Sequence, residues 1–343
     1  MATGFDGIRG HARVIDTLQR AIRGDTVAHA YLFAGPEGVG KELVARTFAA
    51  ALVCDRRPDG PCGVCSACVR AGHGSHPDVV TVWRTRLERK SDEWVETVVQ
   101  FITIDRIREV SKVARYSPVE ARQRVILIRE AETMNEPAAN ALLKTLEEPV
   151  SATVFVLLTA RPHLLLPTIL SRCQRVSFGA LDRASIRQIL TEDLPEGRRV
   201  PADKADLVAA MADGSVSAAL ALVDTDAIGH REEWLDRFVS LNDAAPDQVL
   251  AVAAAMAEDK ARMVVVLDLL RLWVRDLLLA QAGASAELLT NHDRAAAVAA
   301  LAARRPADRL LADLDLVSET ERALRGNVNP RLAAERLLLR MAA

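Results

Sequence analysis

The stretch that decides the fold is Ala30-Tyr-Leu-Phe-Ala-Gly35-Pro-Glu-Gly38-Val-Gly40-Lys41-Glu42. A short apolar run, typical of a strand buried on both faces of a parallel sheet, leads directly into a glycine-rich loop and a helical pattern. Glycines let backbone N–H groups turn towards phosphate oxygens, and the helix N-terminus and a lysine add favourable charge. The alternative is a glycine-rich turn that binds nothing. The spacing favours a P-loop, whose candidate nucleotide-binding residues are Gly35, Gly38, Gly40 and Lys41.

The first half of the chain alternates short apolar runs with helical patterns, which predicts an α/β domain with a parallel five-stranded sheet. The expected strands are Ala30–Ala34, Val79–Val82, Phe101–Ile104, Val125–Ile128 and Val154–Leu158. The expected helices are Ala12–Arg23, Leu43–Leu52, Ile104–Arg115 and Pro137–Leu146. Beyond Phe178 only helical periodicity remains, so the prediction is α/β plus all-α. The expected domains are 1–178, a small helical domain at 179–228 and a larger helical domain at 229–343.

Two positions that serve Mg²⁺ in a working P-loop protein are altered. The residue after Lys41 should carry a hydroxyl, and here it is Glu42, which either binds the metal differently or repels phosphate. The acidic strand should end in an Asp and then a Glu, and this chain has Arg129 and Glu130. Because a guanidinium cannot support a cation, we expect no productive Mg²⁺ site and no hydrolysis. Weak ATP or ADP binding, with Glu42 and Glu130 in the degenerate pocket, stays open.

Four cysteines follow in the pattern C-x7-C-x2-C-x2-C: Cys54, Cys62, Cys65 and Cys68. Four thiolates match a closed tetrahedral zinc site, and in a cytosolic chain this spacing favours metal over disulfides. Because no coordination position is left for chemistry, the predicted role is to fold a small module at 54–68. His73 and His76 could replace a ligand, although surface histidines without a role are the simpler interpretation.

Composition narrows the function classes. The chain has 343 residues, 50% of them hydrophobic, and a formal net charge of -2. It therefore has no global basic field, and any contact with nucleic acid must be local or shared with partner subunits. No apolar run reaches the ~18 residues that span a bilayer, and residues 1–10 show no secretory signal, so a cytoplasmic protein is expected.

Together these motifs resemble the bacterial clamp-loader family, which is built on the AAA+ ATPase fold. The resemblance covers residues 1 to about 225, and the last third matches mainly by being helical. The features that carry it are Phe5–His11, His29–Phe33, the P-loop with cysteines behind its helix, Asn140–Pro149, Ser171-Arg172-Cys173 and the segment 214–220.

The resemblance implies roles that the residues alone do not. Arg172 is similar to an arginine finger that acts in trans on ATP bound by a neighbouring subunit, and Thr159 resembles the polar sensor of the nucleotide pocket. Ser217 stands where motor subunits carry a nucleotide-contacting arginine. The implied architecture is an AAA+ domain, a helical lid and a helical collar for oligomerisation. The implied partners are gamma/tau and delta subunits and, through the complex, the sliding clamp and primed DNA.

Two other functions stay open at this point. Lys41 and Glu130 are retained, as in an active gamma/tau-type ATPase. The cysteines are also compatible with a zinc-dependent nucleic-acid-binding module, although no helix with zinc-finger ligand spacing follows them.

Overall fold

The structure is a computed structural model that describes residues 4–56, 59–90, 93–148, 152–224, 227–241, 244–326 and 328–342. Pro149, the last residue of the Asn140–Pro149 motif, lies outside these ranges. The chain divides into two compact units, Met1–Ser185 and Ile186–Ala343, which are described separately. Within the described ranges no helix has both the length and the apolar character needed to cross a membrane.

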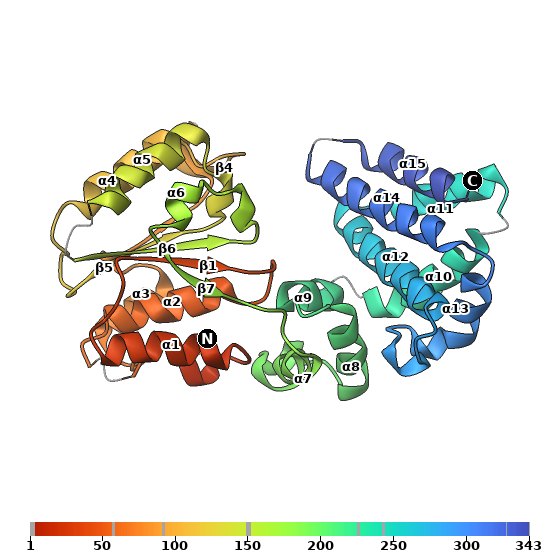
Figure 1. Cartoon of the computed structure of the whole chain (residues 1–343), viewed down its shortest axis with the longest axis horizontal. Helices are drawn as coiled ribbons and strands as arrows, with labels where there is room; N and C mark the ends of the chain where they lie inside the picture. The colour runs from red at the N-terminus through yellow and green to blue at the C-terminus, as the bar shows by residue number, and fades with distance from the viewer. Residues whose placement is uncertain are drawn as a thin grey trace. The chain divides into compact units, whose positions relative to one another are not determined.

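The first unit is built on a parallel five-stranded sheet, as predicted (Figure 1). Its strands, in spatial order, are β2 (Val79–Val82), β5 (Arg124–Ile128), β6 (Thr153–Thr159), β1 (Ala30–Ala34) and β7 (Gln174–Ser177). Every residue of the three central strands is buried, which explains why they are apolar apart from Arg124, Thr153 and Thr159 at their ends.

One predicted strand is wrong and one strand was missed. Phe101–Ile104 forms no strand: Ile102 makes a single parallel bridge to Met134, and a helix begins at Ile104. A short apolar run fits a bridge and a helix start as well as a strand. The fifth strand is β7, in which only Val176 is buried. An edge strand of this kind has no continuous apolar run, so the sequence pattern does not reveal it.

Helices cover both faces of the sheet (Figure 1). On one face, α1 (Ala12–Arg23) and α2 (Lys41–Leu52) pack in the same core as Tyr31 and Phe33 of β1. On the other, α4 (Ile104–Ala114) and α5 (Glu136–Glu147) share a core with Leu32. Successive side chains of a strand point to opposite faces, so a single apolar strand serves both cores. The remaining helices of this unit are α3 (Ser66–His73) and α6 (Pro167–Leu170).

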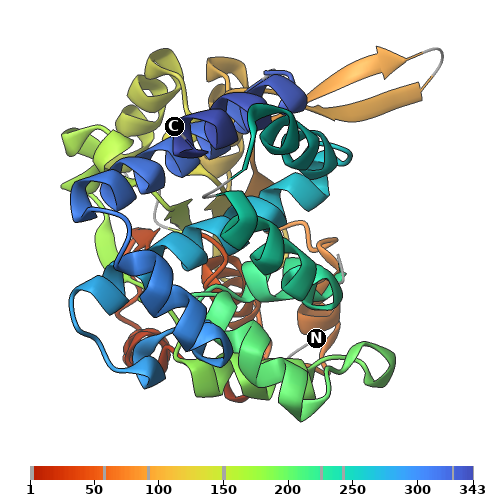
Figure 2. The same ribbon diagram turned by 90° about the vertical axis from the view of Figure 1, so that its right-hand side faces the viewer.

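A two-stranded antiparallel hairpin separates β2 from α4. Its strands are β3 (Thr85–Lys90) and β4 (Glu93–Val98), and they form a sheet of their own (Figure 2). The sequence does not reveal this hairpin, because its residues are mostly polar and lack the apolar alternation that marks a half-buried strand.

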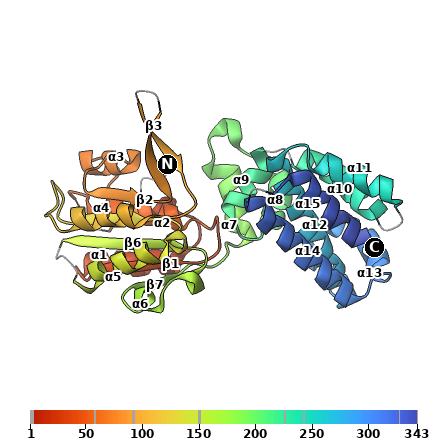
Figure 3. The ribbon, with the colours of Figure 1, turned by 90° about the horizontal axis from the view of Figure 1, so that it is seen from above.

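The second unit is helical, as predicted, and contains no strand among its described residues (Figure 3). The long helix α12 packs against α10, α13 and α14, and α15 packs against α11 and α14. The bounds of the helices beyond β7 are α7 Arg183–Gln188, α8 Ala202–Met211, α9 Val216–Asp224, α10 Ala227–Ser240, α11 Pro246–Met256, α12 Lys260–Gln281, α13 Ala295–Ala302, α14 Ala307–Arg325 and α15 Pro330–Ala342.

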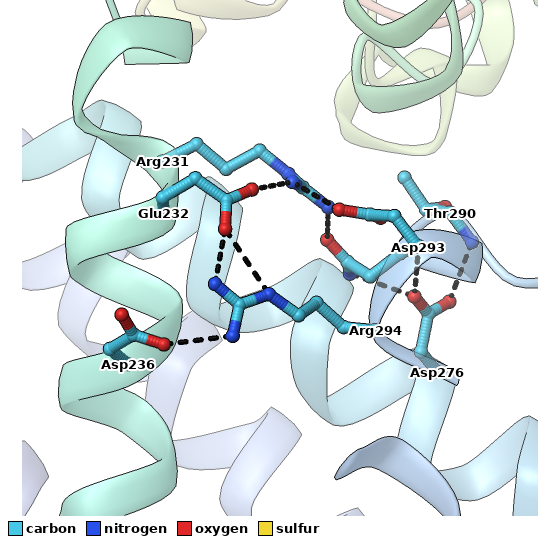
Figure 4. Close-up of polar contacts among 8 residues, drawn as sticks. Arg231, Glu232, Asp236, Asp276, Thr290, Asp293 and Arg294 are labelled. Atoms are coloured by element: carbon cyan, nitrogen blue, oxygen red, sulfur yellow. Dashed lines mark hydrogen bonds and ion pairs between the residues drawn. The ribbon is translucent and has the colours of Figure 1, made fainter. Parts of the chain in front are cut away.

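A buried polar network connects α10, α12 and the segment 290–294 (Figure 4). Arg231 of α10 donates to both carboxylate oxygens of Asp293, at 2.9 and 2.8 Å, and to Asn291 Oδ1 at 2.7 Å. Asp276 of α12 accepts from the backbone N–H groups of Thr290 (3.0 Å) and Asn291 (2.7 Å). Buried charges cost free energy unless they are paired, so this network fixes the segment between the two helices.

Candidate functional site

The predicted nucleotide-binding residues gather at one edge of the sheet. Because β1, β5 and β6 run parallel, their carboxyl ends lie side by side. The P-loop follows β1, Arg129 and Glu130 follow β5, and Thr159 ends β6. The Gly35 N–H donates to the Thr159 carbonyl at 3.2 Å, which ties the start of the loop to β6. The tertiary structure therefore brings these residues together at the carboxyl ends of the strands, and a nucleotide site there stays a prediction.

The loop backbone has the features that a phosphate-binding loop needs. Gly38 and Gly40 have φ values of 77° and 101°, in a region that favours glycine. A Cβ at Gly35 would lie 2.3 Å from the Phe178 carbonyl oxygen, so no larger residue fits there. Helix α2 begins at Lys41, directly behind the loop. The glycines are thus explained by geometry.

The Lys41 side chain bonds to its own loop. Its Nζ donates to the carbonyl oxygens of Gly35, at 2.7 Å, and Pro36, at 2.5 Å. Burial lowers the pKa of Lys41, and the carboxylates of Glu132 and Glu37 partly oppose this shift. In this state the ammonium therefore satisfies loop carbonyls.

The two altered magnesium positions pair with each other. Glu42 Oε2 lies 3.0 Å from Arg129 Nε, although the residues are far apart in sequence. The Arg129 guanidinium also stacks over the Trp83 ring, 5.0 Å from its centroid, in a cation–π contact. The Glu42 carboxylate is therefore paired with a cation of the chain itself.

Glu130, which would orient the attacking water in an active enzyme, is also engaged. Arg84, at the base of the β3–β4 hairpin, donates to its Oε2 and, at 3.4 Å, to the Val99 carbonyl. Trp83 and Arg84 are thus adjacent residues that contact Arg129 and Glu130. The sequence pattern gives no sign of either residue, because their contacts depend on the β3–β4 hairpin, which that pattern does not reveal.

Glu132 is a further pocket residue that the sequence did not suggest. Its side chain is only 4% exposed, and its Oε1 lies 3.5 Å from Arg161 Nε and accepts from the Ala160 N–H at 3.3 Å. The Thr159 hydroxyl is also used, since it accepts from the Arg161 N–H at 3.0 Å. A divalent cation prefers free carboxylate oxygens. Here each of the carboxylates of Glu42, Glu130 and Glu132 already has an arginine partner. Glu132 Oε2 is the one buried oxygen of the three that has no hydrogen bond among the described residues.

Arg172 lies near the amino end of β1, whereas the P-loop lies at its carboxyl end. Strand β7 begins two residues after it, and its first residue, Gln174, pairs with Tyr31 near the start of β1. About four residues of β1 at ~3.3 Å each separate that level from the loop, so roughly 13 Å of sheet intervenes. Arg172 is therefore not placed to contact a phosphate held by its own P-loop.

The Arg172 side chain is 35% exposed and bonds near its own segment. Its Nη1 donates to the Thr168 carbonyl at 3.0 Å, and its Nη2 lies 2.7 Å from Glu147 Oε1. The neighbouring Cys173 is half-buried, and burial raises the pKa of its thiol to about 11. That thiol stays protonated at neutral pH and is a poor nucleophile.

The four cysteines converge as predicted. Their Sγ atoms all lie within 4.8 Å of one another, with 4.0 Å between Cys54 and Cys65 and 3.9 Å between Cys62 and Cys68. Tetrahedral zinc with ~2.3 Å bonds to sulfur requires about 3.8 Å between sulfurs. Backbone N–H groups also donate to the sulfurs of Cys54, Cys62 and Cys65, each at 3.4 Å. The cluster can therefore hold a metal such as zinc.

The pKa values of the thiols agree with a crowded cluster of ligands. The N–H groups of Val64 and Cys65 lower the pKa of Cys62 to about 6, whereas burial raises that of Cys68. Without a cation, close thiolates repel each other and cannot all ionise. His73 and His76 do not belong to the cluster of possible metal ligands, which among the described residues consists of the four cysteines. His76 is buried, contrary to the expectation of a surface residue, and its Nδ1 accepts from the Asp78 N–H at 3.1 Å.

A P-loop on a parallel sheet, a cysteine insertion behind its helix and a helical second half define a class, the AAA+ proteins of the clamp-loader type. The comparison with protein families agrees. The family described as "DNA polymerase III, delta subunit" matches residues 10–182, and its C-terminal counterpart matches residues 225–343. The chain belongs to the DNA polymerase III delta-subunit family.

Individual relatives show where the chain falls within this class. The delta′ subunit of DNA polymerase III from Pseudomonas aeruginosa is 30% identical over 318 residues, which cover 92% of both chains. The tau subunit from Bacillus subtilis is 34% identical over 222 residues, 64% of this chain but 37% of tau. A gamma subunit-related protein from Thermotoga maritima superposes with a TM-score of 0.44, at 18% identity, over 96% of this chain and 98% of that one. This chain is a clamp-loader subunit with delta′ homology.

Proposed function

We propose that the chain is a non-hydrolysing, delta′-type stator of the DNA polymerase III clamp loader. It supplies Arg172 as an arginine finger in trans to ATP held by a neighbouring gamma/tau-type subunit. Its other partner in the ring is a delta subunit, and the assembled complex places the sliding clamp on primed DNA in the cytoplasm. The isolated chain, on this proposal, turns over no ATP.

The observation that carries the proposal is the Glu42–Arg129 ion pair at 3.0 Å. Catalysis of phosphoryl transfer depends on a metal ion that bridges phosphate oxygens and neutralises the developing charge. In this pocket a carboxylate and a guanidinium, which together carry no net charge, stand at the two positions that serve that metal. The pairing of Glu130 with Arg84 removes the residue that would orient water. Both contacts argue against the alternative of an active gamma/tau-type ATPase.

The position of Arg172 supports an action on a neighbouring subunit's nucleotide. It is separated from its own loop by most of the length of β1, and its guanidinium is partly exposed. A guanidinium fixed beside a transferring phosphoryl group contributes about 10³–10⁵ in rate where it has been studied. By family likeness, residues 229–343 act as the oligomerisation collar, 179–228 as the lid and 1–178 as the AAA+ domain. Cys54, Cys62, Cys65 and Cys68 hold a structural zinc ion.

The test compares two variants in a loader reconstituted with gamma/tau and delta subunits of the same organism. Arg172→Ala should lower clamp- and DNA-stimulated ATPase, with at least ~10³-fold loss at the neighbouring site, and leave assembly intact. Lys41→Ala, in this chain's own loop, should leave the stimulated rate unchanged. A normal rate with Arg172→Ala would overturn the arginine-finger role. ATP turnover by the isolated chain that Lys41→Ala abolishes would overturn the non-hydrolysing role.

A further inference from the structure

We propose that Glu147 is a positioning residue for Arg172. Its carboxylate holds the guanidinium within the chain until phosphate oxygens of the neighbouring subunit's nucleotide replace it. This inference rests on the proposed function, because it assigns Glu147 a part in the timing of the arginine finger.

The geometry is that of a pair that can be exchanged. Arg172 Nη2 lies 2.7 Å from Glu147 Oε1, and the two side chains are 35% and 48% exposed. The other contacts of the guanidinium, to the Thr168 carbonyl at 3.0 Å and Ser171 Oγ at 3.4 Å, come from Nη1 and its own segment. Breaking the Glu147 contact therefore frees one side of the guanidinium, while Nη1 keeps it oriented.

The end of α5 is an unfavourable place for an acid. Glu147 is the last residue of α5, where the helix dipole is negative and a carboxylate is locally unfavourable. The α5 residues that pack into the core are apolar, among them Leu142 and Leu146. The arginine from the α6–β7 segment offsets this local mismatch. A local rule broken without a packing reason points to a functional role.

Phosphate can compete for the guanidinium. Arginine binds carboxylate and phosphate with the same planar array of N–H donors. An ion pair this exposed is weak, because water and salt screen it. A triphosphate carries more negative charge than the Glu147 carboxylate. In a closed subunit interface it is also less screened by solvent. Glu147 therefore holds Arg172 when the interface is open and loses it when the interface closes.

The experiment measures ATPase of the reconstituted loader with and without clamp and primed DNA. Glu147→Gln keeps the shape of the side chain and removes its charge. We expect the unstimulated rate to rise about two- to five-fold, the size set by a partly exposed ion pair, while the stimulated rate changes less than about two-fold. Glu148→Gln is the matched control, since Glu148 is the adjacent exposed acid, and it should change neither rate.

Epistasis separates this inference from the proposed function. In an Arg172→Ala background, Glu147→Gln should have no effect, because its action passes through the guanidinium. If Arg172→Ala leaves the stimulated rate normal, the proposed function fails. If Arg172→Ala acts as expected but Glu147→Gln leaves the unstimulated rate unchanged, or lowers the stimulated rate in the same way as Arg172→Ala, the holding role of Glu147 is wrong. Gel filtration of each complex reports assembly independently.

Discussion

Arg129 and Arg172 make nearly the same ion pair, and the proposed function assigns them opposite roles. Their side chains are 33% and 35% exposed, and each lies within hydrogen-bond distance of one glutamate, at 3.0 and 2.7 Å. Arg129 also stacks over the Trp83 ring and directly follows the carboxyl end of β5, where an active enzyme would carry a metal ligand. Arg172 lies near the amino end of β1 and bonds otherwise only near its own segment.

The contrast between these two locations indicates that an ion pair by itself does not determine the role of an arginine. Exposed pairs of this kind contribute only about 0–1 kcal/mol, so neither contact is important for stability alone. What matters is which chemical position the guanidinium occupies and whether a second contact holds it there. On the proposed function, Arg129 blocks a cation site inside the chain, and Arg172 serves a neighbouring subunit.

The largest effect is expected from the cysteine module, and it tests whether the two ends of the sheet are independent. The module packs on α2, which begins with Lys41 and Glu42, and Cys68 Sγ contacts the Ala50 carbonyl. Cys65→Ser should reduce zinc from about one per chain to a small fraction and lower the free energy of unfolding by several kcal/mol. Metal analysis and thermal unfolding measure both.

Cys173→Ser, outside the cluster, is the control and should keep its zinc. The stimulated ATPase per assembled loader should survive Cys65→Ser, because Arg172 lies near the far end of β1. Full zinc content in Cys65→Ser protein, or a loss of stimulated rate in loaders that still assemble, would contradict this separation.

An intermediate effect is expected when the blocked pocket is opened. The double substitution Glu42→Thr with Arg129→Asp restores a hydroxyl and a carboxylate for Mg²⁺. Nucleotide titration of the isolated chain should then show binding at least ~10-fold tighter with Mg²⁺ than with a chelator, about 1.4 kcal/mol. Arg129→Asp alone places two carboxylates together and should not gain this dependence. If the unaltered chain already binds nucleotide in a Mg²⁺-dependent way, the contrast between Arg129 and Arg172 is broken.

The smallest effect concerns Lys41, the half-buried cation of the P-loop. Burial lowers the pKa of Lys41, so the folded state disfavours its charged form. The free energy of unfolding should therefore rise as the pH increases from the lowered pKa towards the ordinary value of 10.5. Lys41→Met should remove this rise and be at least as stable at neutral pH.

Chemical denaturation at several pH values tests the lysine, with the exposed Lys112→Met as control. A stability loss at neutral pH that is specific to Lys41→Met would show that its bonds to the Gly35 and Pro36 carbonyls outweigh the cost of burying the charge.

Much of the fold could be predicted because its signals are local. The central strands are apolar apart from the terminal residues Arg124, Thr153 and Thr159, since both of their faces are buried. The helices have regular periodicity or clear starts, as at Pro330. The edge strand β7 and the β3–β4 hairpin have neither signal and were missed. The cysteine cluster was predictable because close spacing in sequence and the turns between the cysteines bring the thiols together.

The sequence alone predicted the P-loop, the replacement of its magnesium residues, the cluster of four cysteines and the division into α/β and all-α parts. Three ion pairs became visible only in the tertiary structure. They are Glu42 with Arg129, Glu130 with Arg84, and Glu147 with Arg172. Motifs depend on neighbours along the chain, whereas these pairs form between residues that parallel strands and their crossover helices bring together from distant positions.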